Sequence, residues 1–222
     1  MTPLPWSHTA LSDFENCPRA YHEKRVVKSV KEERTEAIVW GELVHKAFED
    51  RLKLGTPLPA HLQEHEDYLV SLQRLPGAGS TEQQIALSKT LRPCGFHADD
   101  VWFRGIIDYQ KIAATSANLR DYKTGKPHSK FAQLKLFALY TFAQYPLVEQ
   151  VEVKYYWTQT QSESGETYTR DEIPRLWGEF LPALKQYAQA FKTNTWQPRS
   201  SGLCNGWCPV TYCEFWRPKR RK

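Results

Sequence analysis

The sequence predicts one α/β domain, and three observations support that prediction. The chain has 222 residues with 41% hydrophobic content, which suits a single sizeable core. Residues 101–112 and 118–125 are strand candidates separated by the polar stretch ATSAN, as expected for an antiparallel hairpin. Residues 130–144 follow and are apolar nearly all round, which is typical of a helix packed on a sheet.

Two further strands and a long helix are expected in the last third of the chain. Residues 151–160 alternate apolar and polar side chains, and residues 166–172 follow the QSESG turn as a partner strand. Residues 174–192 space their apolar side chains by three and four, which predicts a helix. Those side chains are Leu176, Phe180, Leu184, Tyr187 and Phe191.

The N-terminal part is expected to be helical. Residues 9–25 predict a helix that is broken near Pro18, and residues 36–55 predict an amphipathic core helix that ends at Gly55. Its apolar side chains at helical spacing are Val39, Trp40, Leu43, Val44, Ala47 and Phe48. Residues 56–91 contain prolines and the stretch GAGS, so we expect helix with loops there and no second domain. Residues 1–222 are therefore treated as a single domain.

Composition and charge restrict the class of protein. No run approaches the roughly 18 apolar residues of a membrane span, and the N-terminus has no signal-peptide pattern, so we expect a soluble cytoplasmic protein. A net charge of +5 with eight Trp and eleven Tyr permits a nucleic-acid partner without proving one. The cationic tail RPKRRK, residues 217–222, could bind phosphate or simply be solvated.

The stretch LRDYKTGK places two opposite charges on one strand face. Asp121 and Lys123 are two residues apart, so their side chains point the same way, and the predicted hairpin brings Asp108 beside them. Adjacent carboxylates repel unless a divalent cation bridges them, and Mg²⁺ or Mn²⁺ suits such oxygen ligands. This arrangement fits metal-assisted phosphodiester cleavage, with Lys123 either positioning the attacking water or offsetting charge on the phosphorane. The alternative is a surface ion-pair cluster, which would add little stability.

A histidine on the second predicted helix could complete a metal site. Gly41, His45 and Glu49 recur at intervals of four and share one helix face. Imidazole beside carboxylates gives a mixed nitrogen and oxygen ligand set, although a lone histidine is more often an ordinary core or surface residue. Gly41 costs helix stability of about 1 kcal/mol unless another group must approach closely there.

Four of the five cysteines form a pattern. Cys204, Cys208 and Cys213 cluster near the C-terminus, Cys17 lies near the N-terminus, and Cys94 stands apart next to a proline. Cysteines in an intracellular chain are more often metal or redox groups than disulfides. Thiolates at these spacings can hold an iron-sulfur cluster or zinc, and four free thiols are the remaining alternative. Cys94 is expected to be an unligated thiol.

Five short motifs in order resemble the RecB-type branch of the PD-(D/E)XK nucleases. They are CPRAY at 17–21, GELVH at 41–45, GIID at 105–108, DYKTG at 121–125 and QLKLF at 133–137. The order and spacing match over nearly the whole chain. The resemblance implies a restriction-endonuclease-like core with a central mixed β-sheet flanked by helices.

The same resemblance implies roles for individual residues. His45, Asp108, Asp121 and the backbone carbonyl of Tyr122 would hold Mg²⁺ or Mn²⁺, and Lys123 would be catalytic with them. A second set would contact the nucleic acid, and its members are Arg19, Lys126, Gln133, Phe137 and Tyr140. The family usually has a tyrosine where this chain has Phe137, so either this hydroxyl contact is missing or Tyr140 supplies it one turn later.

The cysteine pattern resembles that of the CRISPR-adaptation exonucleases and the AddB-type nucleases. The resemblance implies a 4Fe-4S cluster held by Cys17, Cys204, Cys208 and Cys213, which would tie the chain ends together as a staple. The C-terminal spacing is three then four residues instead of the usual two then five. Zn²⁺ in a site of four cysteines is the main alternative.

The sequence thus favours a metal-dependent DNA exonuclease that acts on single-stranded DNA or DNA ends. It would serve repair, recombination, CRISPR adaptation or viral DNA processing in a bacterial, archaeal or virus-infected host cell. One alternative is a structure-selective flap or junction endonuclease, and another is a catalytically inactive nucleic-acid-binding module. The chain has no GxxxxGK[ST] phosphate loop, so a helicase or recombinase partner would be a separate chain.

Overall fold

The computed structural model describes residues 1–31 and 33–218. The chain forms two compact units, one made of Met1–Arg34 with Gly178–Lys222 and the other of Thr35–Trp177. Each unit is described by itself. The part of the cationic tail from residue 219 onward lies outside the described residues.

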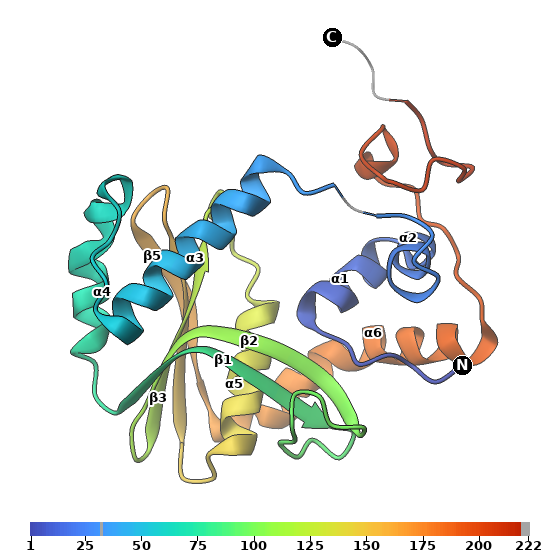
Figure 1. Ribbon diagram of the computed structural model, residues 1–222. Coiled ribbons are helices and arrows are strands. Elements are labelled where there is room, and N and C mark those ends of the chain that lie inside the picture. The colour runs from blue at the N-terminus through green and yellow to red at the C-terminus, as the bar shows by residue number, and fades with distance from the viewer. Residues whose placement is uncertain (32, 219–222) are drawn as a thin grey trace. The chain divides into compact units, whose positions relative to one another are not determined.

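The second unit contains one five-stranded mixed sheet (Figure 1). Its strands are β1 (Ala78–Ser88), β2 (Val101–Ile112), β3 (Ser116–Lys123), β4 (Gln150–Trp157) and β5 (Ser162–Thr169), in that spatial order. The β3–β4 pair is parallel and the other three pairs are antiparallel. The expected α/β class with a mixed sheet flanked by helices is confirmed.

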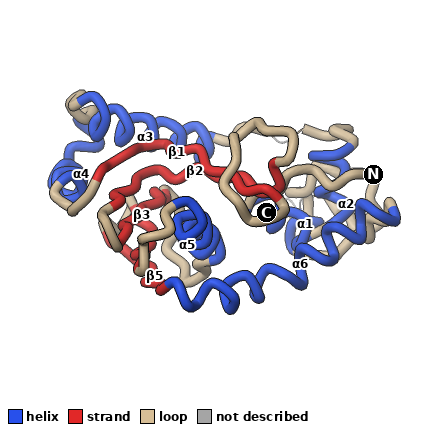
Figure 2. Tube along the Cα trace, turned by 90° about the horizontal axis from the view of Figure 1, so that it is seen from below, coloured by secondary structure: helices blue, strands red, loops and turns tan. Residues whose placement is uncertain are grey.

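Helices cover both faces of this sheet. The second unit holds α3 (Glu36–Leu54), a 3₁₀ helix (Ala60–His65), α4 (Glu66–Gln73), α5 (Ala132–Gln144) and a 3₁₀ turn (Arg170–Glu172). In Figure 2, α3 and α5 lie on opposite sides of β1 and β2. The helix α5 connects the parallel strands β3 and β4, which require such a crossover.

The first unit is built from short N-terminal helices and the larger, C-terminal part of a long helix. Its elements are α1 (His8–Asn16), α2 (Pro18–Tyr21), a π-helical turn (His22–Val26), most of α6 (Ile173–Thr193) and a 3₁₀ turn (Gly202–Cys204). The break expected near Pro18 is present, because this residue starts α2. No helix among the described residues is long and apolar enough to cross a membrane.

The segment 56–91 differs from the sequence-based expectation. Helix with loops was expected throughout, but the GAGS stretch begins β1, an edge strand that pairs along most of its length with β2. Polar residues fill the first half of this strand, and only its last four residues are buried. The strand therefore lacked the apolar alternation by which the other strands were recognised.

The helix α3 forms where expected but buries less than expected. Thr35 caps its start by accepting a hydrogen bond from the amide of Ile38, and Gly55 ends it with a φ of 75°. Only Val44 and Phe48 are buried. Several apolar side chains predicted to be in the core are exposed instead, namely Val39, Trp40 and Leu43.

The buried face of α3 anchors it to the sheet. Phe48 is fully buried and meets the Tyr122 ring of β3 edge-on, with the ring centroids 5.0 Å apart. Both rings belong to a core that includes Leu69 and Leu72 of α4 and Tyr109 of β2. This packing fixes the position of α3 relative to β2 and β3.

We predict that Phe48→Ala lowers the free energy of unfolding by about 3–5 kcal/mol, because it removes a fully buried ring and leaves a cavity. Urea unfolding followed by circular dichroism measures the loss. Leu43→Ala is the matched control, since Leu43 on the same helix is 58% exposed and its truncation should cost no more than about 0.5 kcal/mol. Equal losses in the two variants would contradict this account of how α3 is anchored.

Candidate metal-dependent active site

The site forms where β2 and β3 stop pairing. Their ladder runs from Ile112↔Ala117 to Tyr109↔Arg120 and goes no further. Beyond this pair, a side chain replaces the backbone as the hydrogen-bond acceptor. Oδ2 of Asp108 accepts a hydrogen bond from the amide of Tyr122 at 2.6 Å. This bond satisfies a buried donor that the opened ladder would otherwise leave without a partner.

His45 of α3 connects the two strands at this point. Its Nε2 lies 3.0 Å from the carbonyl oxygen of Tyr122, and its Nδ1 lies 3.4 Å from Oδ1 of Asp108. Burial lowers the pKa of His45, but the hydrogen bond and charge of Asp108, together with the charges of Asp121 and Glu82, raise it to about 9. The metal-free imidazole is therefore protonated at neutral pH, with both nitrogens directed at acceptors.

Asp121 and Lys123 form the ion pair that their spacing predicts. Asp121 is buried, its Oδ2 is paired with Nζ of Lys123, and its Oδ1 accepts a hydrogen bond from Nε2 of Gln133 at 2.7 Å. Lys123 also donates to Oε1 of Gln133 at 3.0 Å. Burial raises the pKa of the Asp121 carboxyl, and the Lys123 ammonium opposes that rise. Gln133 of α5 thus holds both charged groups in place.

An open groove of about 590 Å³ leads to these residues. Its lining includes one face of α3, the carboxylate of Glu82, and the end of β3 with the turn that follows. These residues are Ala37, Ile38, Gly41, Glu42, His45, Lys46, Glu49, Glu82, Tyr122, Lys123, Thr124 and Gly125. At Gly41 an added Cβ would lie 3.4 Å from Oγ1 of Thr124, which is an ordinary van der Waals contact, so the helix passes close to this turn but has room for a methyl group.

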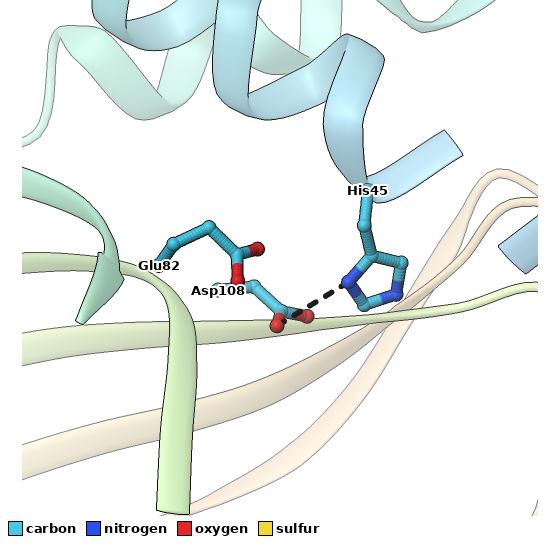
Figure 3. A group of neighbouring side chains, drawn as sticks. All are labelled: His45, Glu82 and Asp108. Carbon is cyan, nitrogen blue, oxygen red and sulfur yellow. Dashed lines mark ion pairs between the residues drawn. The ribbon is translucent and has the colours of Figure 1, made fainter. Parts of the chain in front are cut away.

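Glu82 is a site residue that the sequence analysis missed. One potential ligand atom from each of His45, Glu82 and Asp108 lies within 4.8 Å of the other two (Figure 3). Burial raises the pKa of Glu82 to about 7, and the negative charge of Asp108 adds to the rise. In the sequence, Glu82 could have been singled out as a glutamate on the strand before the GIID motif. That strand, β1, is not predicted from the sequence, so its glutamate was not considered.

Two residues expected to contact nucleic acid are buried. Phe137 and Tyr140 on α5 are 2% and 7% exposed, so neither offers a surface for a base or a phosphate. The hydroxyl of Tyr140 donates to Oε1 of Gln144 at 3.4 Å. Both side chains belong to the buried apolar surface of α5, which the composition of this helix predicts.

The other predicted contacts lie at accessible positions. Lys126 is exposed in the loop between β3 and α5. Arg19 belongs to the first unit, where it forms an ion pair with Glu23 at 3.0 Å and lies 6.0 Å from the ring centre of Tyr212. Both remain predicted nucleic-acid contacts.

The four patterned cysteines line one cavity in the first unit. Cys17, Cys204, Cys208 and Cys213 all border a space of about 70 Å³. Burial raises the pKa of the Cys208 thiol, and the charges of Cys17 and Cys204 add to the rise. Among the described residues, no three thiol sulfurs lie within 4.8 Å of one another. Cys94 lies outside this cavity.

The sequence was compared with protein families and with curated proteins. A family model for the PD-(D/E)XK nuclease superfamily matches residues 5–217. The chain therefore belongs to the PD-(D/E)XK nuclease superfamily. No curated protein sequence matches the chain.

Two solved structures share the fold at low sequence identity. The crystal structure of SSO0001 is 14% identical with a TM-score of 0.53, and the match covers 98% of this chain and 90% of that one. The crystal structure of a protein named "Putative exonuclease" from Eubacterium rectale is 10% identical with a TM-score of 0.53, and the match covers 95% of this chain and 86% of that one. Both similarities concern the fold.

We predict that the metal-free protein loses stability as the pH rises from about 6.5 to 9. The pKa of His45 is higher in the folded state than its usual 6.5, so its protonation stabilises the fold fully below pH 6.5, and this contribution is lost through pH 9. Urea unfolding in EDTA at several pH values measures the slope. His45→Gln should flatten it, and an unchanged slope in that variant would assign the effect to other groups.

Proposed function

We propose that the protein is a metal-dependent DNA exonuclease of the RecB-type branch, acting on single-stranded DNA or DNA ends. The observation that supports this most strongly is the convergence of His45, Asp108 and the Asp121–Lys123 pair where β2 and β3 separate. Membership of the nuclease superfamily gives the class of reaction. The name of the Eubacterium rectale protein favours exonuclease action over internal cleavage.

The residues fit a divalent cation. One imidazole and nearby carboxylates offer nitrogen and oxygen ligands, and the carbonyl of Tyr122 already lies against the imidazole. We propose His45, Asp108, Asp121 and the Tyr122 carbonyl as ligands for Mg²⁺ or Mn²⁺. When bound, the ion supplies a Lewis acid beside the scissile phosphate.

Lys123 is the proposed catalytic cation. Lys123 is one of the residues that line the groove, and Asp121 and Gln133 orient its ammonium. A positive charge held in this way can stabilise the charge that develops on the phosphoryl oxygens in the transition state. Lys126, on the exposed loop three residues later, is proposed to contact the DNA backbone, where it would contribute to affinity.

The cysteine cavity is proposed to hold a 4Fe-4S cluster that joins the N-terminal and C-terminal segments of the first unit. The support is that four cysteines from distant segments border one space. Zinc with four thiolates requires sulfurs about 3.8 Å apart, given Zn–S bonds of about 2.3 Å, and the described sulfurs are not gathered so closely. In a 4Fe-4S cluster each thiolate binds a different iron, so wider spacing is tolerated.

Cleavage of end-labelled linear and circular single-stranded DNA, with Mg²⁺ or Mn²⁺, tests the proposed function. An exonuclease degrades the linear form and leaves the circle intact, because it needs an end. Cutting of the circle would favour a structure-selective endonuclease. Binding without cleavage of either form would identify an inactive DNA-binding module.

We predict that Lys123→Ala lowers kcat by about 10²- to 10³-fold with little change in KM, because the variant loses a pre-organised charge at the reacting phosphate. Steady-state kinetics on a labelled oligonucleotide measures both constants. The comparison variant is Lys126→Ala, which should weaken binding and reduce its salt dependence while kcat stays near the wild-type value. If Lys123→Ala changed only KM, Lys123 would be a binding residue instead.

For the cysteine cavity we predict about four iron and four sulfide per chain in anaerobically prepared protein, with broad absorption near roughly 400 nm. Cys17→Ser should lose the metal and lower the thermal stability, because metal binding contributes to folding. Cys94→Ser, outside the cavity, should leave both unchanged. One zinc per chain would replace the cluster with a zinc staple, and the absence of both metals would leave four ordinary thiols.

A further inference from the structure

Glu82 is held in an unusual way for a residue in the middle of a strand. Its φ is +47°, in the left-handed region that residues with a side chain seldom adopt. The neighbouring pairs Thr81↔Tyr109 and Gln83↔Ile107 keep a constant register around it, so the strand continues on both sides. That register places Glu82 directly across from Asp108 on β2.

Glu82 and Asp108 together carry two carboxylates, and His45 beside them supplies at most one positive charge. Two carboxylates directly opposite each other on adjacent strands repel. Across residues 1–31 and 33–218, no hydrogen bond or ion pair holds the Glu82 carboxylate, although it is half-buried. The Glu82 carboxylate is therefore available to a cation.

The neighbouring acidic side chains already have partners. Asp121 is engaged by Lys123 and Gln133. Glu49, which lines the same groove, forms ion pairs with Lys46 at 3.1 Å and Lys53 at 3.2 Å. Glu82 differs from both, because no such ion pair holds it among the described residues, and Figure 3 shows its carboxylate beside that of Asp108 and the imidazole of His45.

We propose that Glu82 is a ligand of the divalent cation, bound together with His45 and Asp108. One potential ligand atom from each of these three residues lies within 4.8 Å of the others, which is close enough for a single ion to contact all three. The cation offsets the repulsion between the two carboxylates. This inference rests on the metal site of the proposed function and assigns to it a residue outside the recognised motifs.

The role proposed for Asp121 becomes more specific as a result. With Glu82 and Asp108 supplying two carboxylates, the bond between Asp121 and Lys123 is retained when the ion binds. Asp121 then both binds the ion, as proposed above, and orients Lys123. Loss of Glu82 is accordingly expected to weaken metal binding more than the loss of any other carboxylate that lines the groove.

Isothermal titration of the metal-free full-length protein with Mn²⁺, in the absence of DNA, tests the inference. Glu82→Gln should weaken Mn²⁺ binding by at least about tenfold. Glu49→Gln is the matched control, since it removes a carboxylate from the same groove, and it should change the affinity by less than about twofold. Glu82→Gly provides a second variant, because glycine tolerates the left-handed backbone and the fold should be kept.

The outcomes separate this inference from the proposed function. Wild-type Mn²⁺ affinity in both Glu82 variants, while Asp108→Asn loses binding, would overturn the role of Glu82. If the Glu82 variants lose Mn²⁺ but the wild-type protein cleaves no DNA, the ligand assignment stands and the proposed nuclease activity fails. The melting temperature of metal-free Glu82→Gln should equal or exceed the wild-type value, which excludes misfolding as the cause of lost binding.

Discussion

The whole site depends on one hydrogen bond, from the amide of Tyr122 to the carboxylate of Asp108. Where the β2–β3 ladder ends, this bond takes the place of a ladder hydrogen bond and links the two strands. The space that results is where His45 reaches the Tyr122 carbonyl and the Asp108 carboxylate. Sheet geometry, instead of a flexible loop, thus sets the positions of the proposed ligands.

The hydrophobic core fixes the position of α3 next to the point where β2 and β3 separate. Phe48 lies three residues after His45 on α3 and packs on the ring of Tyr122, whose backbone forms part of the site. Tyr122 therefore contributes both to the core, through its ring, and to the site, through its backbone. The ion pair between Asp121 and Lys123 lies next to them, and Gln133 of α5 links it to the other face of the sheet.

Much of this arrangement could be predicted from the sequence. The strand pair around Asp108 and Asp121 and the helix that carries His45 follow from periodicity and turn signals, and the motifs placed the charged residues together. The strand β1 could not be recognised, because its first half is polar and rich in glycine and serine. Glu82 was missed with it, since its importance comes from pairing with β2 and not from its local sequence.

The errors on the helices have a common physical cause. Helical periodicity indicates which residues share a face, but not whether another element covers that face, and so Val39 and Leu43 of α3 were assigned to the core although they are exposed. Phe137 and Tyr140 show the opposite case, in which residues given a surface role from family resemblance are covered by the sheet. The shared cavity of the four cysteines depends on long-range packing that spacing alone does not determine.

The most direct test of the central claim is the rate at which the protein cleaves end-labelled linear single-stranded DNA with and without a divalent cation, for the wild type and for Asp108→Asn. Asparagine keeps an oxygen for the Tyr122 amide and removes the charge. The account predicts cleavage by the wild type with Mg²⁺ or Mn²⁺, none in excess EDTA, and none by Asp108→Asn under either condition. Cleavage in EDTA, or wild-type rates in Asp108→Asn, would contradict it.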